Sequence, residues 1–234
     1  MNMLIGKEVY LWLSYNMERK SSMSIKYVIF DVGGVCYPYS LKPLNDWAVF
    51  NSLNEEEFLE RGGVKGFDYN PYMRGDIDFE EFCKVFCKYS GIEYYKGIEI
   101  AINTKLHEGV GDFYSETLEV IKELKKDGIR VGLLSNALAN LSDTASCLTV
   151  KELSFVSFEL NCLKPEKEIY QKVLDRLLCK PCEIIFVDDK EKNVKGAQEC
   201  GINGIVFNRK TLRKDVFEII NLENTKVLQR EFDR

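Results

Sequence analysis

Short apolar runs alternate with amphipathic helical stretches along most of this chain, and this alternation is the strongest constraint on its fold. Continuous apolar strands separated by helices are typical of a parallel sheet that is covered on both faces. We therefore predict an α/β fold with a doubly wound parallel sheet. The predicted strands are residues 27–30, 129–134, 153–158, 184–187 and 204–207, and the helices between them are residues 115–127, 137–148, 165–178 and 193–200.

About a hundred residues separate the first two predicted strands, far more than one crossover connection needs. Within this interval, residues 38–108 are rich in aromatic side chains and show helical patterning at 41–59, 78–89 and 98–107. We predict a small all-helical cap domain at 38–108, inserted into a core formed by residues 25–37 and 109–234. Residues 1–24 hold an apolar cluster too short for a transmembrane helix, and we interpret them as an N-terminal extension.

Charge and cysteine content exclude several classes of function. The chain has 32 Lys and Arg against 37 Asp and Glu and no basic block, so we expect neither nucleic acid nor a membrane as partner. His107 is the only histidine, which argues against Ser-His-Asp or Cys-His catalysis. Eight cysteines are too sparse for a disulfide framework, and Cys179 and Cys182 form a single CxxC. We expect reduced thiols in a cytoplasmic protein.

The carboxyl ends of three predicted strands carry polar residues, and a lysine precedes the predicted helix at 165–178. These residues are Asp31, Ser135, Asn136, Lys164, Asp188 and Asp189. Taken alone, each has a structural interpretation as a helix cap or a turn. In open α/β sheets, however, ligands bind outside the carboxyl ends of the strands. We therefore expect these side chains to converge at one site.

Three converging carboxylates repel one another unless a cation lies among them, and oxygen ligands favour Mg²⁺. The metal would shield a carboxylate nucleophile from a phosphate dianion. Ser135 and Lys164 would donate to phosphoryl oxygens, and Gly33 and Gly34 would let the backbone approach them. Attack by Asp31 on phosphorus would give an aspartyl-phosphate that water hydrolyses. The pattern favours a phosphohydrolase acting on a small phosphorylated metabolite.

Four motifs in this order resemble those of the haloacid-dehalogenase superfamily over residues 25–208. They are VIFDVGGV with Asp31, GLLSN with Ser135 and Asn136, LKPEKEIYQKVL with Lys164, and IIFVDDKEKNVKGA with Asp188 and Asp189. The resemblance implies metal ligation by Asp31, Asp189 and the backbone carbonyl of Gly33, with Asp188 ligating or supporting them. A helical cap between the first two motifs is similar to that of sugar-phosphate phosphatases, phosphoglycolate phosphatase and dehalogenases.

Gly33 departs from the family pattern, because family phosphatases usually carry an acid/base Asp at this position. A positioned acid is typically worth about 10²–10⁴ in rate, and a poor leaving group suffers most from its loss. We therefore expect a preference for leaving groups that depart easily, as in anomeric sugar, aryl or acyl phosphates. The FDxGxV form also resembles a branch similar to glucose-1-phosphate phosphatases. The same departure leaves an alternative open, a catalytically weak phosphate-binding or regulatory protein.

Two other interpretations fit less well. A dehalogenase also uses an Asp nucleophile but no metal, so it would leave the pair Asp188 and Asp189 unexplained. A response-regulator receiver has its acidic pair before the phosphoacceptor, and the order here is the reverse. Both comparisons favour the metal-dependent branch.

Residues of the predicted cap are harder to assign from sequence. Arg74 is a candidate for substrate binding, although an exposed arginine without that role fits the same pattern. Tyr37, Tyr39 and Trp47 are candidates to line the entrance, or they simply pack the cap.

Overall fold

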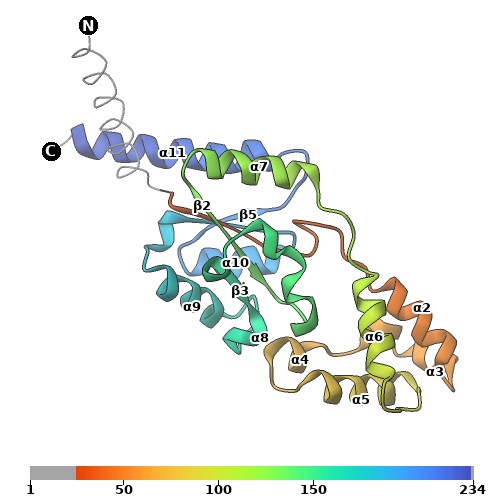
Figure 1. Cartoon of the computed structure of the whole chain (residues 1–234). Coiled ribbons are helices and arrows are strands. Elements are labelled where there is room, and N and C mark those ends of the chain that lie inside the picture. Colours follow the sequence, from red (N-terminus) through yellow and green to blue (C-terminus); the bar gives the residue numbers. More distant parts are fainter. Residues whose placement is uncertain (1–24, 233–234) are drawn as a thin grey trace, which may run out of the picture.

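The computed structural model describes residues 25–232, so the predicted extension at 1–24 lies outside the described residues. One parallel sheet has the strand order β3-β2-β1-β4-β5 (Figure 1). Its strands are β1 (Tyr27–Phe30), β2 (Arg130–Ser135), β3 (Ser154–Val156), β4 (Ile184–Asp188) and β5 (Asn203–Val206). The predicted α/β parallel sheet is confirmed.

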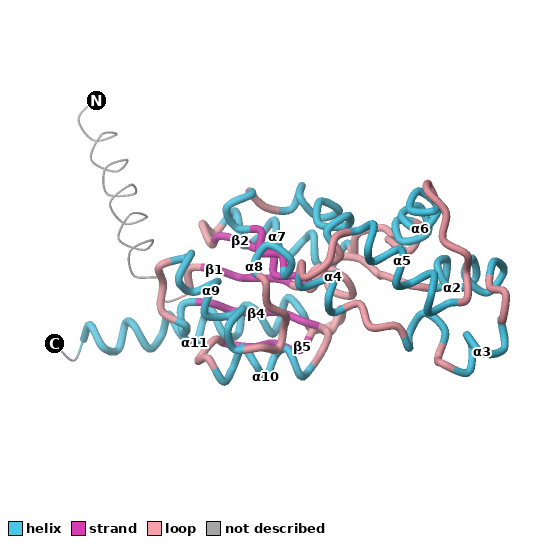
Figure 2. Tube along the Cα trace, turned by 90° about the horizontal axis from the view of Figure 1, so that it is seen from below, coloured by secondary structure: helices cyan, strands magenta, loops and turns pink. Residues whose placement is uncertain are grey.

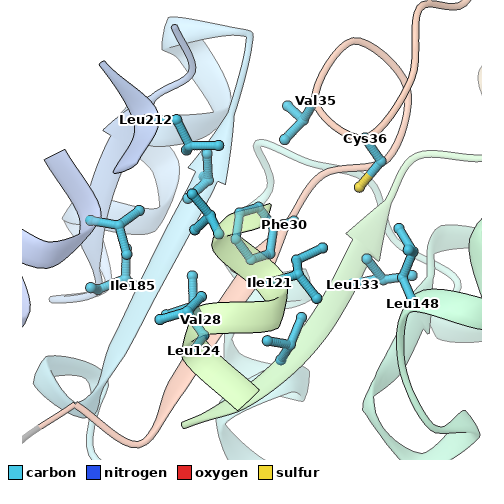
Figure 3. Close-up of a cluster of buried hydrophobic side chains, with 14 of the residues drawn as sticks. Val28, Phe30, Val35, Cys36, Ile121, Leu124, Leu133, Leu148, Ile185 and Leu212 are labelled. Atoms are coloured by element: carbon cyan, nitrogen blue, oxygen red, sulfur yellow. The ribbon is translucent and has the colours of Figure 1, made fainter. Parts of the chain in front are cut away.

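Helices cover both faces of the sheet, because successive side chains of a strand point to opposite faces. On one face, α7 (Ser115–Lys126) and α11 (Leu212–Phe232) bury a cluster that includes Val28 and Phe30 of the central strand (Figure 3). On the other face, α9 (Lys167–Leu177) and α10 (Glu191–Glu199) bury a second cluster with Tyr27 and Ile29. None of the helices within residues 25–232 combines the length and apolarity needed to cross a membrane.

Residues 38–108, here called the helical segment, lie at one end of the molecule, opposite the C-terminal end of α11 (Figures 1 and 2). They pack around their own hydrophobic cluster, in which the ring centroids of Phe67 and Phe86 are 5.3 Å apart in an edge-on contact. The helices are α2 (Lys42–Asn51), α3 (Glu55–Glu60), α4 (Asn70–Arg74), α5 (Phe79–Ser90), α6 (Ile98–His107) and the 3₁₀ helix η1 (Gly63–Gly66).

Residues 137–148 differ from the expectation, since they form a 3₁₀ helix, η2 (Ala139–Leu148), instead of an α-helix. The reason is tertiary. Leu138 and Leu141 pack into the cluster of the helical segment, whereas Ala145 and Leu148 pack against the sheet. Residues three apart lie on one face of a 3₁₀ helix, which suits this split between two cores.

Three smaller differences concern element boundaries. The expected helix at 41–59 is two helices, because the side chain of Asn54 caps α3 by accepting the Glu57 N–H. The strand expected at 153–158 ends at Val156 and continues as α8 (Ser157–Leu160). The helix expected from Pro165 begins at Lys167. Two short 3₁₀ helices, η3 (Lys151–Leu153) and η4 (Pro181–Glu183), precede β3 and β4.

The strand order fixes where a site can form. From β1 the chain adds β2 and β3 on one side of the sheet, and then β4 and β5 on the other. Where the connections from two adjacent parallel strands run to opposite sides, a crevice forms at the carboxyl ends of these strands. Such sheets bind ligands in this crevice. This switch point lies between β1 and β4, and the Asp31 N–H donates across it to the Val187 carbonyl at 2.8 Å.

Candidate active site

The carboxyl ends of β2, β1 and β4 lie side by side and bring the predicted polar residues together. Asp31 follows β1 directly, Ser135 ends β2, and Asp188 ends β4 with Asp189 next in the chain. Pairing of Phe30 with both Leu133 and Val187 places the three strand ends in register. Asp31 and Asp188 therefore flank the switch point from both sides.

Lys164 connects the two buried carboxylates. Its Nζ lies 2.7 Å from Asp31 Oδ1 and 2.7 Å from Asp188 Oδ2, and it also donates to the Leu134 carbonyl at 2.8 Å. An ammonium group has three N–H donors, so all three are used. Because Lys164 is 3% exposed, this charge is held away from water among its partners. The lysine thus fixes and neutralises Asp31, and it would contact a phosphoryl oxygen only by exchanging one of these partners.

Asn136 holds the Lys164 backbone in place. Its side-chain oxygen accepts from the Lys164 N–H at 2.8 Å, and its amide donates to the Lys164 carbonyl at 2.9 Å. Both polar atoms of the side chain are therefore engaged by the loop. Asn136 also lines the cavity, and its amide positions the lysine.

Asp31, Asp188 and Asp189 form a carboxylate cluster in which one oxygen of each lies within 4.8 Å of the others. Oxygen donors at this spacing fit a hard divalent cation such as Mg²⁺. Asp188 is further oriented by Asn193, whose amide donates to both carboxylate oxygens at 3.0 Å, and by the Lys190 N–H at 2.8 Å. The donor set thus fits the predicted metal.

The electrostatics of the cluster follow from its burial. Burial raises the pKa of Asp31, the charge of Lys164 opposes this shift, and Asp188 reinforces it. Burial works to lower the pKa of Lys164, but the two carboxylates outweigh it and the pKa lies above its usual value. Burial also raises the pKa of Asp189, with Lys190 opposing. Two lysines, the buried Lys164 and the exposed Lys190, against three carboxylates leave negative charge that a further cation would balance.

Gly33 and Gly34 follow β1, and they differ in whether the backbone and the surrounding space require glycine. Gly34 has φ +88°, and a Cβ there would lie 2.7 Å from Asp189 Oδ2, so this position admits only glycine beside the cluster. At Gly33 a Cβ would meet Tyr39 Cβ at 3.5 Å, an ordinary contact. A Cβ would therefore fit at position 33, so the space at the Cβ position does not require glycine there.

A cavity of about 390 Å³ opens over the cluster and has two contrasting ends. The carboxylate end is formed by Asp31, Gly33, Gly34, Ser135, Asn136, Lys164, Asp189, Lys190 and Asn193. The tyrosine end is formed by lining residues that belong to the cluster of the helical segment, namely Tyr39, Leu41, Tyr69, Met73, Leu138 and Leu141. Tyr37 lies between them, with its hydroxyl hydrogen-bonded to Thr144.

Arg74 and Trp47 are absent from this lining among the described residues. The Arg74 guanidinium forms two hydrogen bonds to the Glu166 carboxylate, at 2.8 and 2.6 Å, so the geometry gives it a partner other than substrate. Its role is to join α4 to the loop that carries Lys164.

Sequence reasoning missed Asn193 and Tyr69. Asn193 is a buried polar residue that orients Asp188, and a signal for it existed, since it lies in the first turn of the helix after the acidic pair. Tyr69 lines the cavity through the packing of α4, which no local pattern in the sequence indicates.

Comparisons with known proteins agree with this geometry. A family model described as haloacid dehalogenase-like hydrolase matches residues 25–201. The chain is 41% identical over 186 residues to flavin mononucleotide hydrolase 1 of Arabidopsis thaliana, covering 77% of this chain and 65% of that protein. It is 28% identical over 195 residues to mouse acyl-CoA dehydrogenase family member 10, covering 80% of this chain and 18% of that protein. The chain therefore spans less than two thirds of either relative.

Among solved structures, a HAD-family enzyme from Bacteroides thetaiotaomicron, in complex with magnesium and inorganic phosphate, has a similar fold. The TM-score is 0.64 at 23% identity, and the match covers 79% of this chain and 95% of that one. At this identity the likeness concerns the fold.

Proposed function

Because the chain belongs to the haloacid dehalogenase-like hydrolases, we propose that it is a Mg²⁺-dependent phosphatase that hydrolyses small phosphomonoesters through an aspartyl-phosphate on Asp31. One observation carries this proposal. The oxygens of Asp31, Asp188 and Asp189 approach within 4.8 Å at the switch point, beside a buried lysine. The name of the Arabidopsis relative, flavin mononucleotide hydrolase 1, and the magnesium and phosphate bound to the Bacteroides enzyme support it.

Asp31 is the nucleophile in this proposal. One of its carboxylate oxygens attacks phosphorus as the bond from phosphorus to the leaving-group oxygen breaks. Lys164 holds the other oxygen of the carboxylate and neutralises part of the charge. Water then attacks the phosphorus of the aspartyl-phosphate, which releases inorganic phosphate and returns Asp31 to its carboxylate form. Ser135 would donate to a phosphoryl oxygen during both steps.

Asp31, Asp188, Asp189 and the backbone carbonyl of Gly33 would hold Mg²⁺. When bound, the ion would shield the negative charge of the phosphate from that of the nucleophile. The side chains around the cluster prepare for this, because Asn193 and the Lys190 N–H already orient Asp188.

We also propose that residues 38–108 act as a cap over a core formed by residues 25–37 and 109–234. The helical segment has its own hydrophobic cluster, and it supplies Tyr39, Leu41, Tyr69 and Met73 to one end of the cavity. A cap of this kind would exclude bulk water from the reacting phosphate.

The absence of a carboxylate at Gly33 suggests which esters are hydrolysed. With no acid at that position to protonate the departing oxygen, an alkoxide would leave slowly, whereas a phenolate or an anomeric oxygen departs without such help. We therefore propose that aryl and anomeric phosphates are hydrolysed faster than alkyl phosphates.

The direct test is phosphate release from 4-nitrophenyl phosphate and a panel of sugar phosphates, with Mg²⁺ or with EDTA, beside Asp31→Asn. We expect turnover that requires Mg²⁺ and disappears in the variant, with aryl and anomeric substrates ranked first. If a folded protein that binds Mg²⁺ releases no phosphate from any substrate, a phosphate-binding or regulatory role replaces the proposed catalysis.

A further inference from the structure

Two phenol groups at the tyrosine end of the cavity have no protein partner. The hydroxyl oxygens of Tyr39 and Tyr69 are buried, and neither makes a hydrogen bond to any of the described residues. Other tyrosines of the helical segment are paired, since Tyr72 donates to Asn140 Oδ1 at 3.2 Å and Tyr89 donates to the Arg61 carbonyl at 2.8 Å. Both residues line the cavity, and their hydroxyl oxygens are occluded, so a ligand would reach them only after a shift of the rings. Because buried hydroxyls are normally paired, two unpaired ones on cavity-lining residues point to a partner that the protein does not supply.

Both phenol rings pack against the hydrophobic cluster of the helical segment. The Cβ of Tyr39 lies 3.5 Å from the position that a Cβ on Gly33 would occupy. The Tyr69 ring packs edge-on against Phe67, with ring centroids 5.0 Å apart. Each phenol is therefore held by packing before any ligand arrives.

Helix α4, which begins after Tyr69, is fixed to the core by three contacts. Ser157 donates to the Met73 carbonyl at 2.6 Å, Asn161 donates to the Arg74 carbonyl at 3.2 Å, and the Arg74 side chain pairs with Glu166. These contacts anchor α4, the helix that follows Tyr69 and contains Met73, to the core.

The charge and polarity of the residues that line the cavity limit which leaving groups can bind there. The charged residues that line the cavity are Asp31, Lys164, Asp189 and Lys190, all at the carboxylate end, and none of the described residues at the tyrosine end is charged. An anionic leaving group would lose its water there without gaining a cation. A polyol would leave most of its hydroxyls facing Leu41, Met73, Leu138 and Leu141.

Resting on the proposed function, we propose that Tyr39 and Tyr69 form a leaving-group subsite selective for phosphate esters of uncharged, mainly apolar phenols that carry a hydrogen-bond acceptor. The apolar ring contacts the leucines and Met73, and the phenol groups donate to the acceptor. The phosphate of the same ester reaches Asp31 at the carboxylate end. Tyr39 and Tyr69 are specificity-determining residues in this arrangement and take no part in proton transfer.

The test compares kcat/KM with Mg²⁺ for phenyl phosphate, 3- and 4-acetylphenyl phosphate, 4-carboxyphenyl phosphate and glucose 1-phosphate. An acetyl group adds an uncharged acceptor, whereas a carboxylate adds a charged one. All of these esters have leaving groups that depart easily. Within this panel we expect the better acetylphenyl ester to be preferred over phenyl phosphate, and the carboxyphenyl ester and the sugar phosphate to rank lowest. In Tyr39→Phe and in Tyr69→Phe, the ratio of acetylphenyl to phenyl kcat/KM should fall by about two- to tenfold.

Tyr72→Phe is the matched control, because Tyr72 belongs to α4 but is absent from the cavity lining and has a partner in Asn140. It should lower the melting temperature and leave the substrate ratio unchanged. Tyr39→Phe and Tyr69→Phe remove hydroxyls that lack a protein partner, so their melting temperatures should be unchanged or higher. If the two hydroxyls had a structural role, Tyr39→Phe and Tyr69→Phe would lower the melting temperature as Tyr72→Phe does.

The outcomes separate the two proposals. Hydrolysis of all esters with a substrate ratio that neither variant changes would overturn the subsite and leave the phosphatase standing. A preference for the carboxyphenyl ester or the sugar phosphate would overturn it as well. No Mg²⁺-dependent hydrolysis of any ester, phenyl phosphate included, would overturn the proposed function itself.

Discussion

The two ends of the cavity differ in how many of their buried polar groups have partners in the protein. At the carboxylate end, Lys164 uses all three of its N–H donors, and Asp188 accepts from Lys164, Asn193 and the backbone. At the tyrosine end, two buried hydroxyls have no protein partner, and the remaining wall is apolar. The carboxylate end therefore fixes its buried charges through protein partners, although the Asn193 side-chain oxygen there also lacks one, whereas the tyrosine end leaves both of its buried hydroxyls unpaired.

This difference separates the reaction from the choice of substrate. Buried charges need fixed partners, so the end that holds them is rigid and suits one type of chemistry. Neutral hydroxyls and apolar side chains tolerate changes more easily, so the other end can be altered without disturbing the charges. Substitutions at the carboxylate end should therefore change stability and rate together, whereas those at the tyrosine end should change preference.

The largest expected effect comes from removing the ammonium group of Lys164, which two buried carboxylates share. Lys164→Met would leave the buried carboxylates of Asp31 and Asp188 without their partner. Breaking a buried ion pair in this way typically costs about 3–5 kcal/mol of unfolding free energy. Urea denaturation in EDTA measures the loss, and we expect added Mg²⁺ to recover part of it, because a bound cation stabilises the folded state.

Lys172→Met provides the control, because Lys172 pairs with Glu168 of α9 and donates to the Leu160 carbonyl, but its side chain is 37% exposed and holds no buried carboxylate. Such a surface pair is worth about 0–1 kcal/mol. If Lys164→Met lost no more stability than Lys172→Met, the carboxylate end would not depend on its buried charge, and the contrast between the two ends would fail.

A second, smaller effect tests the leaving-group argument. Gly33→Asp introduces a carboxyl group where a Cβ has room. A positioned acid should raise kcat for alkyl phosphates by about 10²-fold and change aryl phosphates much less, since phenolates depart unaided. Steady-state kinetics on both classes of ester provide the measurement.

A substitution at the adjacent Gly34 provides the matched comparison for Gly33→Asp. Gly34→Ala would place a Cβ 2.7 Å from Asp189 Oδ2 at a φ of +88°, so we expect it to lower activity on both classes. An equal gain on alkyl and aryl esters in Gly33→Asp would show that leaving-group protonation does not limit the rate, and the argument from Gly33 would be wrong.

The smallest effect concerns the link between the two ends. Arg74 of α4 pairs with Glu166, which lies beside the loop of Lys164, and the two side chains are 31% and 41% exposed. A double-mutant cycle with Arg74→Met and Glu166→Gln should give a coupling of about 0.5 kcal/mol after screening by solvent. Denaturation curves of the four proteins measure it.

The pH dependence of this coupling has a definite sign. The hydrogen bonds from Arg74 lower the pKa of Glu166. A group with a lowered folded-state pKa stabilises the fold above its unfolded value, about 4.3 for Glu, and loses that contribution as the pH falls through the folded value. We expect the full coupling at neutral pH and none in acid. A coupling that persists below that range would rule out an ionic origin.

The sequence predicted much of the carboxylate end because several of its residues stand at strand ends. Asp31, Ser135 and Asp188 directly follow or end apolar runs, and parallel strands bring their carboxyl ends to one edge. The strand order, which places β1 between β2 and β4, is consistent with this convergence. Asn193 belongs to the same pattern, as a polar residue one turn into the helix after the acidic pair.

The tyrosine end was not predictable in the same way. Tyr39 and Tyr69 are thirty positions apart, and the path between them turns through α2, α3 and η1. Their common place in the cavity lining depends on how these short helices pack, a tertiary effect with no local signature. The same reason explains η2, whose residues divide between two cores, and Arg74, whose partner Glu166 lies 92 positions away.

The most direct test of the account is to find where the phosphoryl group goes during turnover. Rapid acid quenching of the enzyme with 4-nitrophenyl phosphate and Mg²⁺, followed by peptide mass mapping, locates the modified residue, with Asp31→Asn measured in parallel. The account predicts one phosphoryl group on the peptide that contains Asp31, and neither label nor turnover in the variant. A phosphoryl group on another residue, or undiminished turnover in Asp31→Asn, would contradict it.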